Sequence, residues 1–196
     1  MKPFINIILR KLFFRKRPRM GHKEIEVIKK ILTELHPQRC LEWGSGYSTL
    51  YFPKFLTENA KWISIEHSRE WANRIKRMNR NSGVEVFYVP PNHYPWSDVN
   101  QDGSYSDLKD YIEFPRKFGN FDFILVDGRA RKDCLTVAYD IISDGGVVIL
   151  HDAERKYYHE PFKLYKYQRL FPGGQKGIRD LWIGSKKLNI KKLSIY

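Results

Sequence analysis

A turn with two glycines, followed by an acidic residue, carries the clearest sign of chemistry in the chain. The run from Glu42 to Ser48 contains Gly44 and Gly46, and Glu66 lies further along. Glycines permit a tight bend and let backbone N–H groups approach a ligand, and a helix starting there adds partial positive charge. An acid about 20 residues after such a turn can hold both hydroxyls of a ribose. Together they predict an adenosine-containing ligand, whereas a G-x-G by itself can serve turn geometry only.

Acidic and basic residues also gather after two later apolar runs. Asp127 follows residues 121–126, and His151 and Asp152 follow residues 147–150. Open α/β sheets place their chemistry at the carboxyl ends of strands, so these side chains are candidate catalytic groups. The neighbouring arginines at 129, 131 and 155 either clamp an anionic group of a substrate or pair with nearby acids.

The elements that must position these residues alternate between strands and helices. Strands are expected at 39–43, 61–67, 84–89, 121–126 and 147–150, and helices at 23–35, 48–59, 68–80 and 132–142. Such alternation predicts a parallel α/β sheet with right-handed crossovers. Residues 167–171 and 178–183 predict a terminal hairpin. The polar, proline-punctuated stretch 90–115 predicts a lid or substrate loop.

Length and charge predict one domain with two basic ends. The 196 residues carry a formal charge of +13, of which residues 1–20 hold +7 and residues 186–196 hold +4. The body, 21–185, keeps only +2, which argues against nucleic acid as the partner. We therefore expect a basic amphipathic extension at 1–20, a catalytic domain at 21–185 and a basic tail at 186–196. The extension either contacts an anionic membrane surface or is a partly ordered basic segment.

The cysteines and the apolar runs bear on location. Cys40 and Cys134 both fall in segments that are expected to be buried, so no disulfide framework is indicated. The apolar run 4–9 is too short to span a bilayer, and no cleavage site follows it. These features predict a cytoplasmic protein, or one attached peripherally to the inner face of a membrane.

Four blocks of sequence in a fixed order resemble the class I S-adenosylmethionine-dependent methyltransferases. The blocks are residues 40–46, 63–67, 121–128 and 145–152, and the resemblance covers roughly residues 38 to 185. It implies a Rossmann-like α/β fold, with a mostly parallel seven-stranded sheet, a C-terminal antiparallel hairpin and helices on both faces. It also implies S-adenosylmethionine (SAM) as the cofactor.

The resemblance assigns roles at the cofactor site residue by residue. It implies that Glu42, Gly44 and Gly46, with Ser45 between the glycines, line the methionine part of SAM. Glu66 would hold the ribose and His67 would lie beside the adenine. Asp127 is expected to contact the cofactor as well. Where the family often has a third glycine this chain has Ser48, whose hydroxyl is expected to cap the following helix.

The implied reaction is methylation, most simply O-methylation, of a small-molecule or sugar acceptor. Asp127, His151 and Asp152 are the expected catalytic residues, supplying a base and positioning hydrogen bonds without metal. In the alternative route, the two aspartates hold a divalent cation that lowers the pKa of the acceptor hydroxyl. Metal-dependent relatives usually have Asp-Asn on the fifth strand, whereas this chain has Asp152-Ala153. The oligomeric state is not indicated.

Two other classes of protein compete with this interpretation. A nicotinamide-dependent oxidoreductase would use the same first turn, but Leu50 stands where the longer G-x-G-x-x-G pattern requires glycine. The basic ends leave open an inactive methyltransferase-like module that binds nucleic acid or an anionic membrane.

Overall fold

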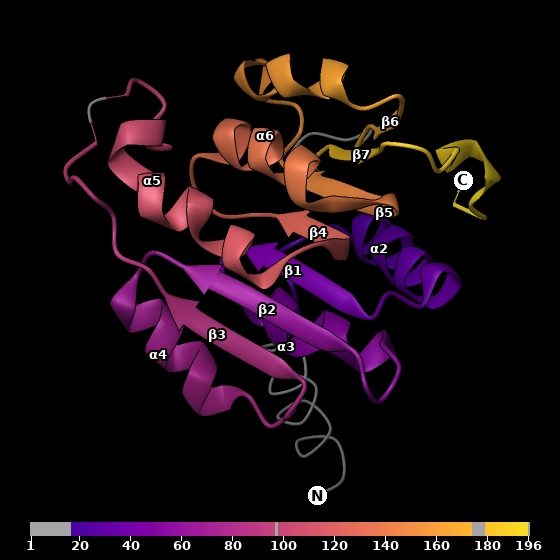
Figure 1. The fold of residues 1–196 in the computed structure, drawn as a ribbon, viewed down its shortest axis with the longest axis horizontal. Helices are drawn as coiled ribbons and strands as arrows, with labels where there is room; N and C mark the ends of the chain where they lie inside the picture. The colour runs from indigo at the N-terminus through magenta and orange to yellow at the C-terminus, as the bar shows by residue number, and fades with distance from the viewer. Residues whose placement is uncertain (1–16, 97, 174–178, 196) are drawn as a thin grey trace, which may run out of the picture.

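A single mixed sheet organises the protein, which is described here by a computed structural model covering residues 17–96, 98–173 and 179–195. Its seven strands lie in the order β3-β2-β1-β4-β5-β7-β6 (Figure 1). Their bounds are β1 Arg39–Trp43, β2 Lys61–Glu66, β3 Val84–Tyr88, β4 Phe121–Val126, β5 Ile142–His151, β6 Tyr167–Phe171 and β7 Leu181–Ser185. The first five pair in parallel, and β7 pairs antiparallel with both β5 and β6. The predicted fold class and terminal hairpin are confirmed.

Helices cover both faces of the sheet. Because successive residues of a strand point to opposite sides, the strands contribute side chains to the hydrophobic clusters on both faces. The helices are α2 His22–Leu35, α3 Tyr47–Tyr51, α4 Arg69–Met78, α5 Tyr105–Glu113 and α6 Arg131–Ile141. Leu41 and Trp43 pack in one hydrophobic cluster with α5 and α6, whereas Cys40, the residue before Leu41, points to the other side of the sheet and packs in the other cluster with α2 and α4. Figure 1 shows α5 and α6 on one side of the sheet and α3 and α4 on the other.

The strand order reverses between β1 and β4, and this point is where open α/β sheets bind ligands. The strand ends are held in register there. Gly44 N donates to Ile65 O at 2.8 Å, and Asp127 N donates to Trp43 O at 2.9 Å. The glycine turn after β1, Glu66 at the end of β2 and Asp127 after β4 therefore share one edge.

The prediction of a lid or substrate loop at 90–115 is wrong for the second half of this range, because helix α5 lies there. Leu108, Tyr111 and Ile112 are fully buried in the core, at the i, i+3, i+4 spacing of a helix face. Ser104 caps this helix, accepting from Asp107 N, while Asp107 accepts from Ser104 N at 2.9 Å. Ser104 and Asp107, three residues apart, were the signal in the sequence from which the start of this helix could have been predicted.

Two element boundaries also differ from prediction. The helix expected at 48–59 ends at Tyr51 and continues as a 3-10 turn from Phe52 to Phe55, because Pro53 cannot donate a helical hydrogen bond. Strand β5 begins at Ile142, directly after α6, and not at residue 147.

The C-terminal segment packs on the domain and does not form the expected tail. Ile190 and Ile195 are 2% and 3% exposed and join the cluster around α2. Ser194 N donates to the Glu34 carboxylate of α2 at 3.1 Å. Most of the predicted N-terminal extension, residues 1–16, lies outside the described residues.

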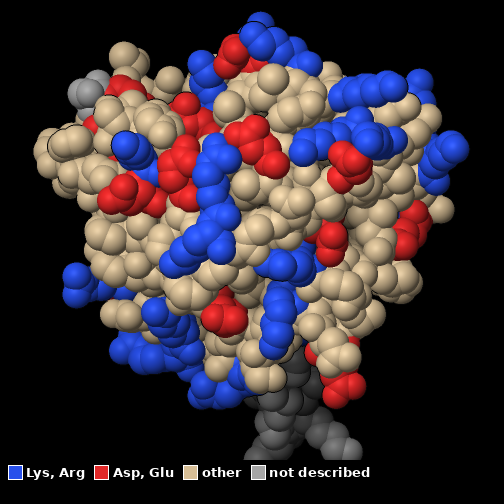
Figure 2. All heavy atoms as spheres, viewed as in Figure 1, with Lys and Arg blue, Asp and Glu red and all other residues tan. Residues whose placement is uncertain are grey.

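The surface of the body carries more local charge than its small net value suggested. Basic side chains gather over α4, at the lower left of Figure 2, where the helix contains Arg69, Arg74, Lys76 and Arg77. Within the described part of the chain, no helix combines the length and the apolarity needed to cross a membrane.

Candidate active site

The two glycines of the β1 turn are present for different reasons. Gly44 has φ +95°, and a Cβ there would lie 2.5 Å from the Cα of Gly128, so only glycine lets the ends of β1 and β4 approach. Gly46 has extended backbone, and the nearest described atom to an added Cβ is Ser48 Oγ, at 3.3 Å. Backbone packing therefore requires Gly44, whereas at Gly46 an added Cβ would press only on the hydroxyl of Ser48.

Glu66 holds this turn in place. One carboxylate oxygen accepts from Ser45 N and the other from Ser68 N, both at 2.8 Å. His67 Nδ1 lies 3.0 Å from the same carboxylate. The sequence therefore brings the turn and the acid together, as predicted, because β1 and β2 are neighbours and end at the same level.

A cavity of about 460 Å³ opens between these groups, within the size range of small-molecule sites. It is lined by Arg19, Gly44, Ser45, Gly46, Tyr47, Ser48, Glu66, His67, Ser68, Trp71, Asp127, Gly128 and Arg129. Every predicted cofactor residue lines it except Glu42.

Glu42 instead lies in the core beneath the turn and is fully buried. Its carboxylate accepts hydrogen bonds from four neutral donors: Ser48, Thr49, Trp62 and Ser64. Burial raises the pKa of Glu42 to about 7, against the lowering effect of these hydrogen bonds. The expected capping role of Ser48 is wrong, because its hydroxyl donates to Glu42 and the α3 N-terminus has no side-chain cap.

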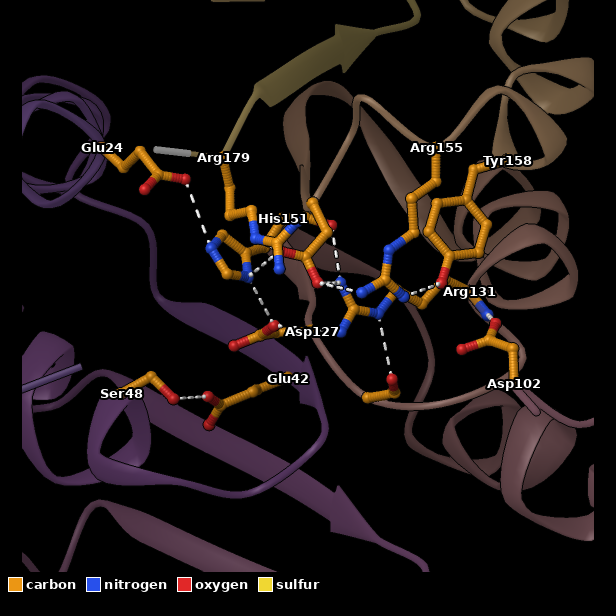
Figure 3. A network of polar contacts seen from close by, with 12 residues as sticks. Glu24, Glu42, Ser48, Asp102, Asp127, Arg131, His151, Arg155, Tyr158 and Arg179 are labelled. Atoms are coloured by element: carbon orange, nitrogen blue, oxygen red, sulfur yellow. Dashed lines mark hydrogen bonds and ion pairs between the residues drawn. The ribbon is translucent and has the colours of Figure 1, made fainter. Parts of the chain in front are cut away.

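His151 connects two carboxylates from different elements (Figure 3). Its Nδ1 lies 2.8 Å from Asp127 Oδ1 after β4, and its Nε2 lies 3.3 Å from Glu24 Oε1 on α2. Burial by itself lowers the pKa of His151, but the charge of Asp127, hydrogen bonding to Asp127 and Glu24, and the charge of Asp152 together raise it to about 10. Conversely, although burial opposes it, the charges of His151 and Arg131 lower the pKa of Asp127. At neutral pH, this arrangement is an imidazolium between two carboxylates.

A buried guanidinium ties the ends of β4 and β5 together. Arg131 is 5% exposed and donates to the backbone oxygens of Gly128, at 3.0 Å, and His151, at 2.7 Å. It also contacts Asp152 Oδ2 at 3.1 Å. Arg131 is thus part of the framework and not a clamp for a substrate anion.

The carboxylate of Asp152 pairs with several arginine side chains. The backbone of Asp152 has a left-handed φ of +58°. Besides Arg131, Arg155 lies 3.1 Å and Arg179 lies 3.4 Å from its carboxylate. Of the three candidate arginines, only Arg129 lines the cofactor cavity, where it lies over the Trp96 ring at 5.6 Å.

The residues present do not fit the divalent cation of the alternative route. Asp127 and Asp152 already face an imidazolium and guanidinium groups, which would repel a metal ion. Across the described ranges, no three His, Cys, Asp or Glu side chains are placed to hold a metal.

Four residues around Asp127, His151 and Asp152 come from outside the motifs: Glu24, Arg131, Arg155 and Arg179. Glu24 shows no catalytic signal in the sequence, because an acid in the first turn of a helix ordinarily complements the helix dipole. It does serve that end of α2 too, accepting a hydrogen bond from Gly21 N.

Comparison with known proteins places the fold. No protein-family model and no curated protein matches the chain. Among solved structures it is similar to a methyltransferase-like protein from Silicibacter pomeroyi, with 23% identity, 91% of this chain and 94% of the other covered, and a TM-score of 0.63. An O-methyltransferase from Bacillus cereus, in complex with SAH, is 16% identical, with 95% and 92% covered and a TM-score of 0.64.

A third similar structure is the O-methyltransferase of tomaymycin synthesis from Streptomyces achromogenes, in complex with SAM. It is 17% identical, with 86% of this chain and 81% of the other covered and a TM-score of 0.59. The chain therefore has the Rossmann-like fold of class I SAM-dependent methyltransferases, as the resemblance implied.

Proposed function

We propose that the protein is a SAM-dependent O-methyltransferase acting on a small-molecule acceptor. The observation that carries the proposal is one cavity bounded by the glycine turn, Glu66 and Asp127 at the point where the strand order reverses. Similar folds that bind SAM or SAH support it. When bound, SAM supplies an activated methyl group on a sulfonium.

Each cofactor-binding residue would contact a different part of SAM. The carboxylate of Glu66 is held by two backbone N–H groups and keeps further lone pairs for the two ribose hydroxyls. His67 lies next to it, on the adenine side. The turn from Gly44 to Gly46 leaves room for the methionine part, and Glu42 shapes that turn from beneath without touching the ligand.

Asp127 is the group placed to handle the acceptor. It lines the cavity, 23% of its side chain is exposed, and its lowered pKa keeps it ionised at neutral pH. An acceptor hydroxyl would donate to this carboxylate and be oriented by it. Asp127 would take up the hydroxyl proton when the acceptor oxygen receives the methyl group that bound SAM supplies.

His151 and Asp152 would act through Asp127. Because His151 is already protonated at neutral pH, it has no free lone pair for a proton from the acceptor. We propose that it is a positioning residue that keeps Asp127 ionised and fixes its rotamer. Asp152 would hold the arginines that connect β4 to β5.

Two finer expectations remain proposals. A sugar is one class of hydroxyl-bearing acceptor that we propose, and residues 1–20 are expected to contact an anionic membrane surface. Sedimentation with anionic vesicles, compared between the full chain and one that lacks residues 1–20, tests the second expectation.

Calorimetric titration with SAM tests the proposal, using Glu66→Ala against Glu70→Ala. Glu70 is an exposed acid at the start of α4 and does not line the cavity. We expect Glu66→Ala to weaken SAM binding by about 10- to 100-fold, the effect of removing hydrogen bonds to a charged group, and Glu70→Ala to leave it unchanged. Absence of SAM binding to folded wild-type protein, or equal affinity in Glu66→Ala, would contradict the assignment.

Titrations with other ligands and an assay of methyl transfer separate the rival classes. An oxidoreductase would bind a nicotinamide dinucleotide in this cavity more tightly than SAM. An inactive binding module would bind RNA or vesicles and transfer no labelled methyl group to any acceptor.

A further inference from the structure

A second cavity, of about 500 Å³, opens at the same edge of the sheet as the cofactor cavity. It lies between the first turns of α2, the end of β6 and the start of β7. Its lining residues include Lys23, Glu24, Val27, Arg169, Phe171 and Arg179. The sheet register places Phe171 opposite Leu181, and Leu181 opposite His151. This second cavity therefore adjoins the Asp127–His151 pair.

The His151 imidazole lies between one lining residue of each cavity, Glu24 and Asp127 (Figure 3). Asp127 lines the cofactor cavity and Glu24 lines the second cavity, and His151 lies between them at 2.8 Å and 3.3 Å. Along the chain, Arg19 lines the first and His22, three residues on, lines the second. The carboxylates that line the two cavities are thus only one imidazole apart, and His151, 6% exposed, is the side chain between them.

The charges around the second cavity favour an anion. Its basic lining residues are Lys23, Lys30, Arg169 and Arg179, against two acids, Glu24 and Glu26. The acids are engaged elsewhere: Glu26 pairs with Lys29 at 2.9 Å, outside the lining, and Glu24 faces the His151 imidazolium. Arg179 is likewise paired, with Asp152 and Glu154, so Lys23 and Arg169 are the basic groups that give the lining an excess of positive charge toward a bound molecule.

Apolar side chains make up the remainder of the walls. Val27 and Leu181 are buried at the base, Phe171 is half-buried, and Leu170 is 44% exposed. Leu170 lies on β6, which is the last strand of the sheet. A cavity with apolar walls and a few placed charges is the usual form of a site for a small organic ligand.

Building on the proposed function, we propose that the second cavity binds the methyl acceptor, and that the acceptor is an elongated hydroxylated molecule with an apolar body and an anionic group. The anionic group would lie near Lys23 and Arg169, and the apolar body against Phe171 and Leu170. The hydroxyl would reach past His151 to Asp127, where it loses its proton as the methyl group is transferred.

Two fluorescent probes with the same ring system test the ligand class without SAM. They are 8-anilinonaphthalene-1-sulfonate, an anion, and N-phenyl-1-naphthylamine, its neutral counterpart. We expect the anion to bind about tenfold more tightly, as charge-assisted contacts are the stronger ones. Equal affinities, or tighter binding of the neutral probe, would overturn the ligand class.

Matched variants locate the probe. Lys23→Glu should weaken anion binding by about fivefold and leave the neutral probe unchanged, and Leu170→Asp should weaken both. Lys109→Glu and Leu164→Asp make the same substitutions at exposed positions that do not line the second cavity, and should change neither. Unchanged anion binding in Lys23→Glu, or displacement of the probe by SAM, would overturn the location.

A matched pair of phenols tests the acceptor role: one carries an alkanoate tail and the other the corresponding alkanol tail. In the presence of SAM, we expect the acid to displace the anionic probe and to be methylated at least about tenfold faster than the alcohol. Methylation that favours the alcohol, or an acid that displaces the probe but is not methylated, would overturn this role. Failure of SAM to bind would instead contradict the proposed function, and the probe experiments would still decide the ligand class.

Discussion

Two carboxylates at the ends of neighbouring strands have opposite surroundings. Glu42 on β1 is fully buried among neutral donors, and burial raises its pKa to about 7. Asp127, after β4, is partly exposed to the cofactor cavity, and despite the opposing effect of burial its pKa is lowered by His151 and Arg131. The strands pair in register, Glu42 with Leu125 and Trp43 with Val126.

The difference shows how the surroundings of a carboxyl group make it structural, as at Glu42, or available for chemistry, as at Asp127. A carboxyl group surrounded by hydroxyl and indole donors fixes a turn and gains nothing from contact with a ligand. A carboxylate neutralised by fixed cations beside a cavity stays ionised and available at neutral pH. The predictions below alter one member of this comparison at a time.

The largest effect is expected from Asp127→Asn, which removes the ionised group beside the cavity. We expect kcat to fall by about 100- to 10,000-fold, the range for removal of a general base. Asp122→Asn is the control, because Asp122 on the same strand accepts from Gln38 and Arg39 N–H groups, both at 3.0 Å, away from the cavity. A steady-state assay in which both variants keep wild-type kcat would remove Asp127 from the chemistry.

The two glycines of the turn should separate folding from binding. Gly44→Ala should lower the free energy of unfolding by more than about 3 kcal/mol, from positive-φ strain and a backbone clash. Gly46→Ala should cost much less stability, because only the Ser48 hydroxyl must shift, and should bind SAM more weakly, since Gly46 lines the cavity. Urea unfolding and calorimetry measure the two effects, and equal destabilisation by both substitutions would contradict the distinction.

Glu42 should make stability depend on pH. Its folded pKa of about 7 lies above the unfolded value of 4.5, so its contribution is complete below pH 4.5 and is lost as pH rises through 7. The free energy of unfolding of the wild type, relative to Glu42→Gln, should fall by about 3 kcal/mol between pH 4.5 and pH 8.5. Urea unfolding at both pH values measures it, and a constant difference would show that Glu42 is ionised in the fold.

The smallest effect is expected from Glu24→Gln, which removes one charge that raises the pKa of His151. At pH 7 the imidazole stays protonated, so kcat should fall less than about tenfold. The alkaline limb of the pH–rate profile should move below its wild-type position near pH 10. Glu26→Gln, on the same helix but paired with Lys29, should leave the profile unchanged.

The sequence predicted the parts of the site that are local to one motif. The first strand, its glycine turn and the following helix are contiguous in the sequence. Asp127 likewise follows directly on one apolar run, and His151 follows directly on another. Their hydrophobic patterns predicted the strands, and the parallel order then placed Gly44, Glu66 and Asp127 at one edge.

The rest depended on contacts between distant segments. Glu24 reaches His151 across 127 positions of sequence, and Arg179 reaches Asp152 from just before β7. Such pairings leave no local pattern, and neither does the difference between Glu42, which is enclosed, and Asp127, which faces a cavity. Helix α5 was missed for another reason, because the polar residues of its exposed face concealed the buried Leu108 and Tyr111.

A crystal structure of the protein with S-adenosylhomocysteine tests most directly whether the cavity at the β1 turn is the cofactor site. The account predicts both ribose hydroxyls on the Glu66 carboxylate and the amino-acid portion against Gly44 and Gly46. A ligand lying in the second cavity, or a saturated crystal in which the Glu66 carboxylate contacts no ligand atom, would contradict it.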